Sequence, residues 1–190
     1  MTLHITGDTD ADELLGSNPF ALLLGMLLDQ QVAMETAFAG PAKIRDRAGT
    51  LEPAALAAFD PEKFVEVFRE SPAVHRYPGS MAGRAQALSQ AITDDWQGDA
   101  TLLWTEGDPD GAEILRRLKK LPGFGEQKAK IFLALLGKQR GLQADGWEKA
   151  SAPYGEKDSY RSVADIVSAE SLAQVRETKK AAKAAAKKKA

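Results

Sequence analysis

The chain has 190 residues, no cysteine, and 25 Lys and Arg residues against 27 Asp and Glu residues. This length suits one domain or two small lobes with a real hydrophobic core. The lack of cysteine excludes disulfides, a thiolate-bound iron–sulfur cluster and a cysteine nucleophile, and the widely separated His4 and His75 argue against a histidine-based zinc site or a Ser-His-Asp triad. The longest apolar run, residues 20–28, is too short to cross a bilayer, and the first residues lack a secretory signal pattern. We therefore expect a soluble cytoplasmic protein.

The net charge of −2 hides a strong segregation of charge along the chain. Residues 179–190 carry six lysines and no acid, and residues 116–140 carry eight basic residues and one acid, which gives +7. The remaining residues hold 11 basic and 26 acidic groups, or −15. The basic window is either a preferred place for an anion or a solvated helix face. The lysine-rich tail is either a salt-sensitive attraction for DNA or a solubilising extension.

The first half of the chain has the pattern of successive helices. Asn18 followed by Pro19 is typical of a helix start, and the apolar residues after it recur at helical spacing on several faces. This predicts a central, buried helix that ends at Asp29-Gln30-Gln31. Further helices are expected over about 33–48 (kinked or interrupted at Gly40-Pro41), 53–59, 61–70 and 81–96, with a loop at 71–79.

The second half predicts a pair of helices joined by a tight turn. Asp110 and Glu113 have capping-box spacing, Pro122 stops the helix that follows, and a second helix over 126–136 is expected to end at Gly137. Residues 138–157 predict a long ordered loop, and a final helix is expected to begin near Asp158. Weak strand signals occur at 3–6 and 102–104, and the tail after Glu177 predicts a mobile segment. The pattern as a whole predicts an all-α fold.

The turn between the two helices has the composition of an anion site. Gly123 and Gly125 permit backbone angles that side chains disfavour, and they leave amide groups exposed at the start of the next helix. Lys128 and Lys130 follow at once, so phosphate is the obvious ligand. The alternative is an ordinary corner between two helices, in which the glycines only allow the turn.

The segment LPGFGEQKAKIFLALLG, residues 121–137, resembles the helix-hairpin-helix of the base-excision DNA glycosylases. The resemblance covers roughly residues 18–147. It implies a two-lobed all-α fold over residues 1–178, with the hairpin (about 111–137) beside the cleft between the lobes, a catalytic loop (about 138–157), and a flexible tail at 179–190. It also implies a nucleoid-associated protein of the cytoplasm, acting as a monomer on double-stranded DNA that contains a damaged base.

Asp145 is the candidate catalytic residue that the resemblance indicates. It stands 18 residues beyond Gln127, which matches the family's spacing between hairpin and catalytic aspartate. Loss of a base leaves positive charge on the sugar, and a nearby carboxylate stabilises that charge in the transition state and orients or deprotonates water. The alternative is that Asp145-Gly146 is merely a turn dipeptide.

Other residues are assigned by position within the same resemblance. Because the target base is inaccessible in a stacked duplex, such an enzyme extrudes the nucleotide, and Gln31 or Met81 would fill the gap. Gln31 could equally cap its helix, and Met81 could be core filler. Trp147 and Gln30 would line the base pocket, although Trp147 could be a core residue. The expected DNA-binding residues are Gly123, Phe124, Gly125, Gln127, Lys128, Lys130, Gln31, Met81 and Arg84.

Two departures from the family pattern refine the expected activity. Members that nick DNA use a lysine at the position of Gln127, whereas Lys128, one residue later, should point elsewhere, towards phosphate. This predicts a monofunctional glycosylase. The missing cysteine cluster places the chain with cluster-free branches, among them alkylated-purine glycosylases, so an alkylated purine is the preferred substrate. No cofactor and no protein-ligated metal are expected, apart from a possible monovalent cation at the hairpin.

Two other functions remain open from the sequence. One is a catalytically silent protein that keeps the hairpin and recognises DNA damage or DNA structure. The other is a helical scaffold that does not bind DNA.

Overall fold

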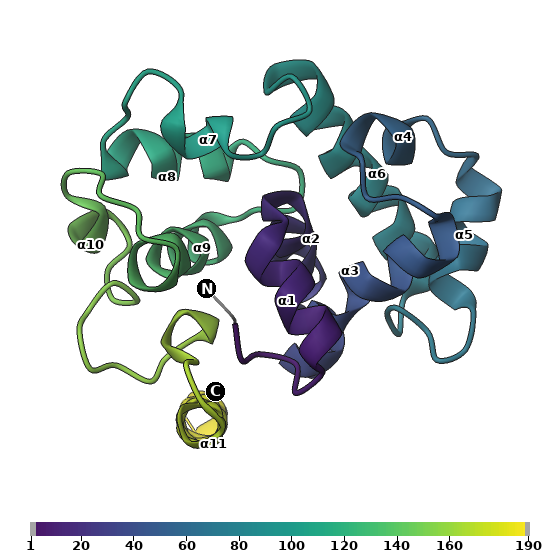
Figure 1. The fold of residues 1–190 in the computed structure, drawn as a ribbon. Coiled ribbons are helices and arrows are strands. Elements are labelled where there is room, and N and C mark those ends of the chain that lie inside the picture. The colour runs from purple at the N-terminus through teal and green to yellow at the C-terminus, as the bar shows by residue number, and fades with distance from the viewer. Residues whose placement is uncertain (1–2, 189–190) are drawn as a thin grey trace.

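A computed structural model describes residues 3–188, and within that range the protein is all-helical, as predicted (Figure 1). The α-helices are α1 (Thr9–Ser17), α2 (Pro19–Leu28), α3 (Met34–Ala48), α4 (Pro53–Ala57), α5 (Pro61–Arg69), α6 (Pro78–Asp95), α7 (Leu102–Thr105), α8 (Gly111–Lys119), α9 (Glu126–Gln139), α10 (Trp147–Ala150) and α11 (Ala169–Lys188), with a 3-10 turn, η1 (Val163–Asp165), before the last.

Helix α2 lies at the centre of the molecule, as its apolar residues predict. Asn18 caps it by accepting a hydrogen bond from the backbone amide of Ala21, and Pro19 occupies the first turn. Every residue from Phe20 to Leu28 is buried. Figure 1 shows α1 and α2 between two groups of helices, α4 to α6 on one side and α8 to α10 on the other. The end of α2 is therefore placed next to residues from both halves of the chain.

Helices α2 and α3 approach each other closely through two glycines. A Cβ atom at Gly25 would lie 2.5 Å from the Phe38 ring, and one at Gly40 would lie 2.5 Å from a methyl group of Leu28. Helix α3 runs through Gly40 and Pro41 without an interruption, so of the two expected outcomes, a kink or an interruption, the interruption does not occur. Gly40 is needed for packing against α2.

Helices α8 and α9 form the predicted hairpin, but α9 is longer than expected. Gly123 in the turn has a φ of 79°, and the Leu27 side chain occupies the space where its Cβ would stand, so both backbone and packing require glycine there. Helix α9 continues to Gln139. Gly137 does not end it. Because Gly137 has no side chain, the Trp147 ring packs directly against the helix at this position.

The C-terminal segment differs from the expected helix beginning near Asp158. Val163–Asp165 forms a 3-10 turn closed by a capping box with Ser162, and the carboxylate of Asp165 accepts a 2.5 Å hydrogen bond from Lys138. This local turn is favoured over the expected helix because Ser and Asp side chains hydrogen-bond to the nearby backbone. Helix α11 begins only at Ala169.

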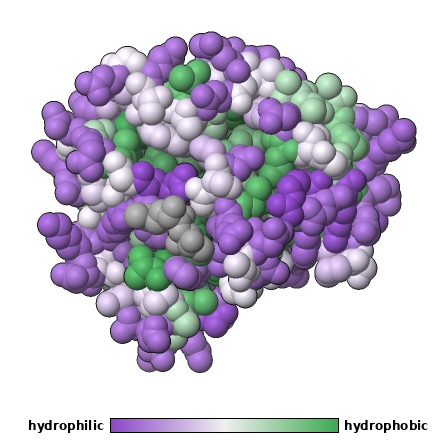
Figure 2. Space-filling model, viewed as in Figure 1, coloured by the Kyte–Doolittle hydropathy of each residue, from purple (hydrophilic) through white to green (hydrophobic). Residues whose placement is uncertain are grey.

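The last helix leaves most of its length in solvent. Ser171 and Val175 are buried, whereas every side chain from Arg176 to Lys188 is exposed. Figure 2 shows mostly hydrophilic residues over the end of the molecule that α11 occupies. Residues 189 and 190 of the predicted tail lie outside the described residues.

Neither strand signal of the sequence corresponds to a strand. Residues 102–105 form α7, and the backbone amides of Ile5 and Thr6 donate to the buried side chain of Asp12 instead of to a neighbouring strand. Between residues 3 and 188, none of the helices combines the length and the apolar character that a membrane-spanning segment needs.

Candidate active site

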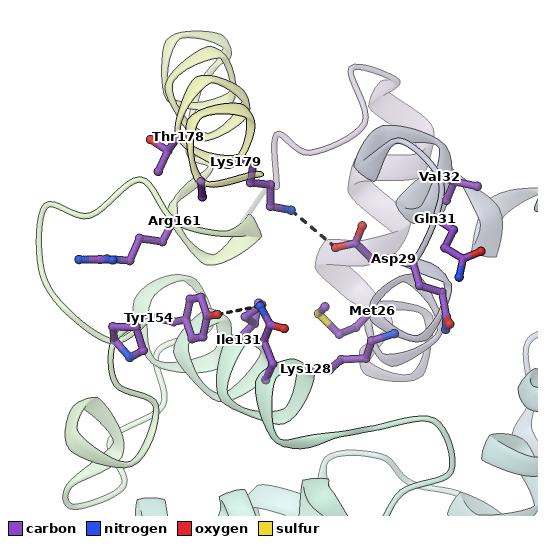
Figure 3. A pocket seen from close by; sticks show the side chains of 14 residues that line it. Met26, Asp29, Gln31, Val32, Lys128, Ile131, Tyr154, Arg161, Thr178 and Lys179 are labelled. Atoms are coloured by element: carbon purple, nitrogen blue, oxygen red, sulfur yellow. Dashed lines mark hydrogen bonds and ion pairs between the residues drawn. The ribbon is translucent and has the colours of Figure 1, made fainter. Parts of the chain in front are cut away.

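A pocket of about 430 Å³ opens where the end of α2 meets the start of α9, within the size range of small-molecule sites. Figure 3 shows side chains from α2, α9, α11 and the 153–161 segment pointing into it. Its lining combines apolar groups with a few polar and charged ones. The lining residues are Met26, Asp29, Gln30, Gln31, Val32, Gln127, Lys128, Ile131, Pro153, Tyr154, Arg161, Thr178, Lys179 and Ala182.

Asp29 is the one carboxylate among the residues that line this pocket. It follows the last residue of α2, and its side chain is 14% exposed. Burial raises the pKa of its carboxyl above the usual value, Lys179 and Lys128 oppose that rise, and Glu35 adds to it. Asp29 is thus a partly desolvated acid between two cations, an environment found at catalytic carboxylates.

Lys128 enters the same pocket from the first turn of α9. Its ammonium group donates a 2.8 Å hydrogen bond to the backbone oxygen of Leu27, at the carboxyl end of α2. Free carbonyls and the helix dipole favour a cation at that place. Burial nevertheless lowers the pKa of Lys128 to about 8, against the effect of Asp29 and with a smaller contribution from Arg84.

The backbone beside Asp29 is fixed by a network of polar side chains. The side-chain amide of Gln30 also donates to the Leu27 oxygen, at 2.9 Å, and Arg84 of α6 donates to the side-chain oxygen of Gln30 at 2.9 Å. Because the Tyr77 amide donates to Nδ1 of the buried His75, the other ring nitrogen, Nε2, carries the proton and donates to the Gln30 oxygen at 2.8 Å. Gln30 therefore links the end of α2 to Arg84 and His75 and has a positioning role beside Asp29.

Gln31 lies at the rim of the pocket in a strained conformation. Its φ is 58°, in the left-handed region that a non-glycine residue adopts at a cost of about 1 kcal/mol or more, and its side chain is exposed. Gln31 does not cap α2, since the capping amide there belongs to Asp29. Strain of this kind clusters at functional sites.

Tyr154 and Arg161 line the side of the pocket opposite α2, and in Figure 3 the Tyr154 ring points towards the α2 side whereas the Arg161 guanidinium points away from it. The amide of Gln127 donates a 2.9 Å hydrogen bond to the hydroxyl of Tyr154. The half-buried phenol ring, with Ile131 and Met26, supplies the apolar surface that a flat heterocycle needs for stacking.

Helix α11 covers the remaining side of the pocket. Lys179 lies 4.0 Å from the carboxylate of Asp29, and Arg176, one turn earlier, forms an ion pair with Glu35 of α3. The lysine-rich segment that begins at residue 179 thus supplies a cation to the candidate site (Figure 3).

Most of the basic window at 116–140 is engaged within the protein. Arg117 donates to the carbonyls of Leu103 and Glu106 and pairs with Glu113, and Lys138 pairs with Asp165. Arg140 donates to the Gly16 carbonyl. The window is therefore not a continuous DNA-facing surface, because Arg117, Lys138 and Arg140 are bonded to neighbouring segments.

The structure places Asp145 away from this pocket. Its exposed side chain precedes α10, and its backbone oxygen accepts a 2.8 Å hydrogen bond from the amide of Gly111, the first residue of α8. Gly111 is the first of the nine residues of α8 and the turn follows the last of them, a helix length of about 13 Å. The expectation that Asp145 faces the turn is corrected, because the loop after α9 folds back onto the start of α8.

Trp147 also lies outside the pocket. Its backbone packs against Gly111 and its ring against Gly137, so it joins α8 to α9. Close packing on two glycines explains both its position and the interior glycine of α9. The core alternative for Trp147 is the one that the structure supports.

Several other expected DNA contacts have structural roles. Met81 is 2% exposed and Phe124 is 4% exposed, and the Phe124 ring packs edge-on against Phe132. A buried side chain cannot enter a duplex, so the wedge role of Met81 is corrected and the Phe124 side chain has a packing role. A phosphate contact of the turn that contains Phe124 stays a prediction. Lys130 does not line the pocket and pairs with Glu126 at 3.2 Å.

The anion-binding role expected of Gly125 stays a prediction. It is exposed, with a φ of −75° that any residue adopts, and no side chain caps the amides of α9 that follow it. These first-turn amides have no partner within their own helix. The turn therefore offers them to a ligand, although the backbone requires glycine only at Gly123.

The structure brings Gln30, Gln31, Gln127 and Lys128 together at one pocket, with Arg84 behind them. Sequence reasoning missed Asp29, Tyr154 and Lys179. Asp29 had a detectable signal, since it is a charged residue directly after a fully apolar helix and directly before two glutamines. Tyr154 had none, because the fold of the 151–161 segment brings it to α9.

Comparison with known proteins identifies the family. Residues 24–190 match the family described as HhH-GPD superfamily base excision DNA repair protein. Neither the curated proteins nor the solved structures that were compared include a match to this chain. The matched residues span the buried helix end, the hairpin and the whole candidate pocket, and the fold is all-helical as that family requires. The chain therefore belongs to the HhH-GPD superfamily of base excision DNA repair proteins, a superfamily of DNA glycosylases.

Proposed function

We propose that this protein is a monofunctional DNA glycosylase that uses Asp29 in the role the sequence assigned to Asp145. The observation that carries the proposal is the position of Asp29, the one carboxylate lining a base-sized pocket at the start of the hairpin's second helix. The protein acts as a monomer, and its ligand is double-stranded DNA that contains a damaged base, with the damaged nucleotide turned out of the stack.

The chemistry follows from the charges around that carboxylate. As the bond between C1′ and the base nitrogen breaks, its electron pair leaves with the base and the sugar becomes cationic. Ionised Asp29 stabilises that cation and takes the proton of the water that attacks C1′. The departing base takes that electron pair, so a cationic base leaves neutral, whereas a neutral base leaves with negative charge that the neighbouring Lys128 and Lys179 are placed to offset. The products are the free base and an abasic site.

The proposal of water as nucleophile rests on Gln127 and on how Lys128 is held. Gln127 bonds to Tyr154 and cannot form a Schiff base. Lys128 faces the pocket, contrary to its expected direction, but its nitrogen donates to the Leu27 oxygen, and with a pKa of about 8 it is mostly protonated at neutral pH. A protonated amine is not a nucleophile.

An alkylated purine is the substrate that the pocket favours. Alkylation of a purine ring nitrogen leaves the base cationic, and a cation is attracted both to an aromatic face and to a carboxylate. Tyr154 and Asp29 provide these two groups on facing walls of the pocket (Figure 3). Cationic bases also leave readily, which suits a site with one carboxylate.

The decisive experiment compares Asp29→Asn with Asp145→Asn. Duplexes with alkylated, oxidised, deaminated or mismatched bases are incubated with each protein, and abasic sites are revealed by alkali on a denaturing gel. Asp29→Asn is expected to lower the excision rate about 100- to 1,000-fold, the usual effect of removing one electrostatic stabiliser, and Asp145→Asn to leave it unchanged. The reverse result would return the catalytic role to Asp145.

The same gel without alkali tests the monofunctional assignment. Intact strands are expected before alkali treatment. Strand nicking without alkali, together with a borohydride-trapped adduct that Lys128→Arg abolishes, would instead make Lys128 a nucleophile.

The second candidate is a protein that recognises damage without cleaving it. The observation that favours it is the absence of any carboxylate from the 138–157 loop among the residues that line the pocket. It predicts preferential binding to a damaged duplex with no base released from any member of the panel.

A further inference from the structure

A second groove adjoins the pocket. It is lined by Gln31, Val32, Ala33, Thr36, Ala73, His75, Arg76 and Lys183, and we refer to it as the lateral groove. Gln31 and Val32 line both cavities, so these two residues form the ridge between them. No residue of α9 lines the lateral groove, so it leaves the pocket on the side away from the hairpin.

The lateral groove carries positive charge from separate elements. Arg76 comes from the loop before α6, Lys183 comes from α11 one helical turn after Lys179, and no Asp or Glu is among the lining residues. Lys43 of α3 lies at the edge, where its nitrogen donates 3.2 Å to the carbonyl of Ala73. Between residues 3 and 188, no ion pair within 4.0 Å engages Arg76 or Lys183.

Arg76 is held at a fixed position relative to the pocket. Its neighbour His75 is 1% exposed and bonds to the backbone of both Gln30 and Tyr77, which ties the loop to the residue after Asp29. The Arg76 guanidinium lies 5.1 Å from the centre of the Tyr77 ring. The exposed cation at residue 76 is thereby fixed relative to the site of base extrusion, which distinguishes it from a freely moving surface charge.

We propose that the lateral groove binds the phosphodiester backbone directly beside the extruded nucleotide, with Arg76 and Lys183 each contacting one phosphate. This inference rests on the proposed function, since it supposes a nucleotide in the pocket. The backbone of that nucleotide leaves the pocket in two directions. On one side, the backbone phosphate contacts the free amides at the start of α9. On the other side, the backbone phosphates contact the cationic lateral groove beyond Gln31.

The test measures binding without catalysis. Fluorescence anisotropy gives the Kd for a duplex with one tetrahydrofuran abasic-site analogue at a series of salt concentrations, for the full-length protein and for Arg76→Gln, Lys183→Gln and the double variant. Each lost phosphate contact is expected to weaken binding and to reduce the slope of log K against log salt by about 0.9, so the double variant loses about 1.8.

Matched controls separate the groove from general surface charge. Lys180→Gln lies on the same helix and Arg69→Gln on α5, both exposed and outside the groove. Their slopes are expected to change by less than half as much. All four single variants replace exposed side chains, so melting temperatures should match the parent protein.

Single methylphosphonate linkages locate the contact. Neutralising one or two phosphates on one side of the abasic analogue is expected to weaken binding by the parent protein but not to weaken binding by the double variant further. Equal losses for both proteins at every position, or unchanged salt slopes, would overturn the groove assignment even if the protein excises bases. Groove-dependent binding without base excision would overturn the proposed function alone.

Discussion

Asp29 and Lys128 line the same pocket, and burial shifts both of their pKa values towards neutrality. The pKa of Asp29 is raised and that of Lys128 is lowered to about 8. Burying these groups costs stability, because each charged form loses hydration. Such a cost is typical of residues retained for chemistry rather than for folding.

These two shifts predict a bell-shaped pH profile for base excision. Asp29 must be ionised, so the rate rises with pH through a folded-state pKa above the ordinary 3.8. Lys128 loses its charge as the pH passes about 8, and the rate falls there on a substrate whose base leaves with negative charge. Single-turnover rates from pH 4 to 10 measure both limbs.

Lys128→Arg is the informative variant for the alkaline limb. Arginine keeps its charge throughout the range, so the rate should stay level above pH 8. Lys130→Arg is the matched control, because Lys130 lies on the same helix and outside the pocket. An alkaline limb that persists unchanged in Lys128→Arg would assign that titration to another group.

Lys179 affects the pH at which the acid limb of the rate profile lies. Its ammonium group lowers the pKa of Asp29 from a distance of 4.0 Å. Lys179→Met removes that attraction, so the pKa of Asp29 rises and the acid limb moves to higher pH. Lys128 and Glu35 still act on Asp29 in this variant, the first opposing and the second reinforcing the rise.

The measurement for Lys179 is the position of the limb. Comparing the profile with that of Lys180→Met removes the effect of total charge. A lower rate with no displacement of the acid limb would mean that Lys179 contributes to binding and does not act through Asp29.

At the scale of elements, the hairpin is held in place by a ring packed on a helix. Trp147 lies against Gly111 of α8 with its backbone and against Gly137 of α9 with its ring, so one residue fixes both helices. Asp145 lies two residues before Trp147 in the same loop, so the packing of Trp147 determines where Asp145 lies.

Gly137→Ala is expected to lower the free energy of unfolding by about 1–3 kcal/mol, because the new methyl group overlaps the Trp147 ring. Urea denaturation measures the change. Gly83→Ala is the control, since a Cβ at this exposed position of α6 meets nothing within 4 Å, and alanine should stabilise the helix by about 0.5–1 kcal/mol. Equal effects of the two substitutions would contradict the packing role of Trp147.

At the scale of the molecule, an acidic protein approaches a polyanion through a limited set of cations. The basic window at 116–140 is largely engaged in internal contacts, and the exposed lysines of α11 extend beyond the pocket instead. Figure 2 shows the hydrophilic character of that end of the molecule.

Deleting residues 179–190 is expected to leave the melting temperature nearly unchanged, because the buried residues of α11, Ser171 and Val175, are retained. Binding to undamaged duplex should weaken most at low salt, where phosphate attraction is least screened. Thermal denaturation and anisotropy at two salt concentrations measure these effects. Weakening of equal size at both concentrations would indicate loss of a non-ionic contact.

The sequence by itself determined the elements that depend on neighbouring residues. Caps at Asn18 and Asp110, prolines at helix starts, and the apolar periodicity of α2 all act within a few residues, so the all-α fold and the hairpin could be predicted. The resemblance of residues 121–137 led to the family that residues 24–190 match.

Only the tertiary structure decided which carboxylate lies at the pocket. Counting residues from Gln127 selected Asp145, but a loop's path depends on what it packs against, and Trp147 draws this one to α8. Asp29, Tyr154 and Lys179 meet at the pocket from three separate segments. Spacing along a chain determines contacts only within a helix or a turn, whereas contacts between distant segments depend on the packing of the whole core.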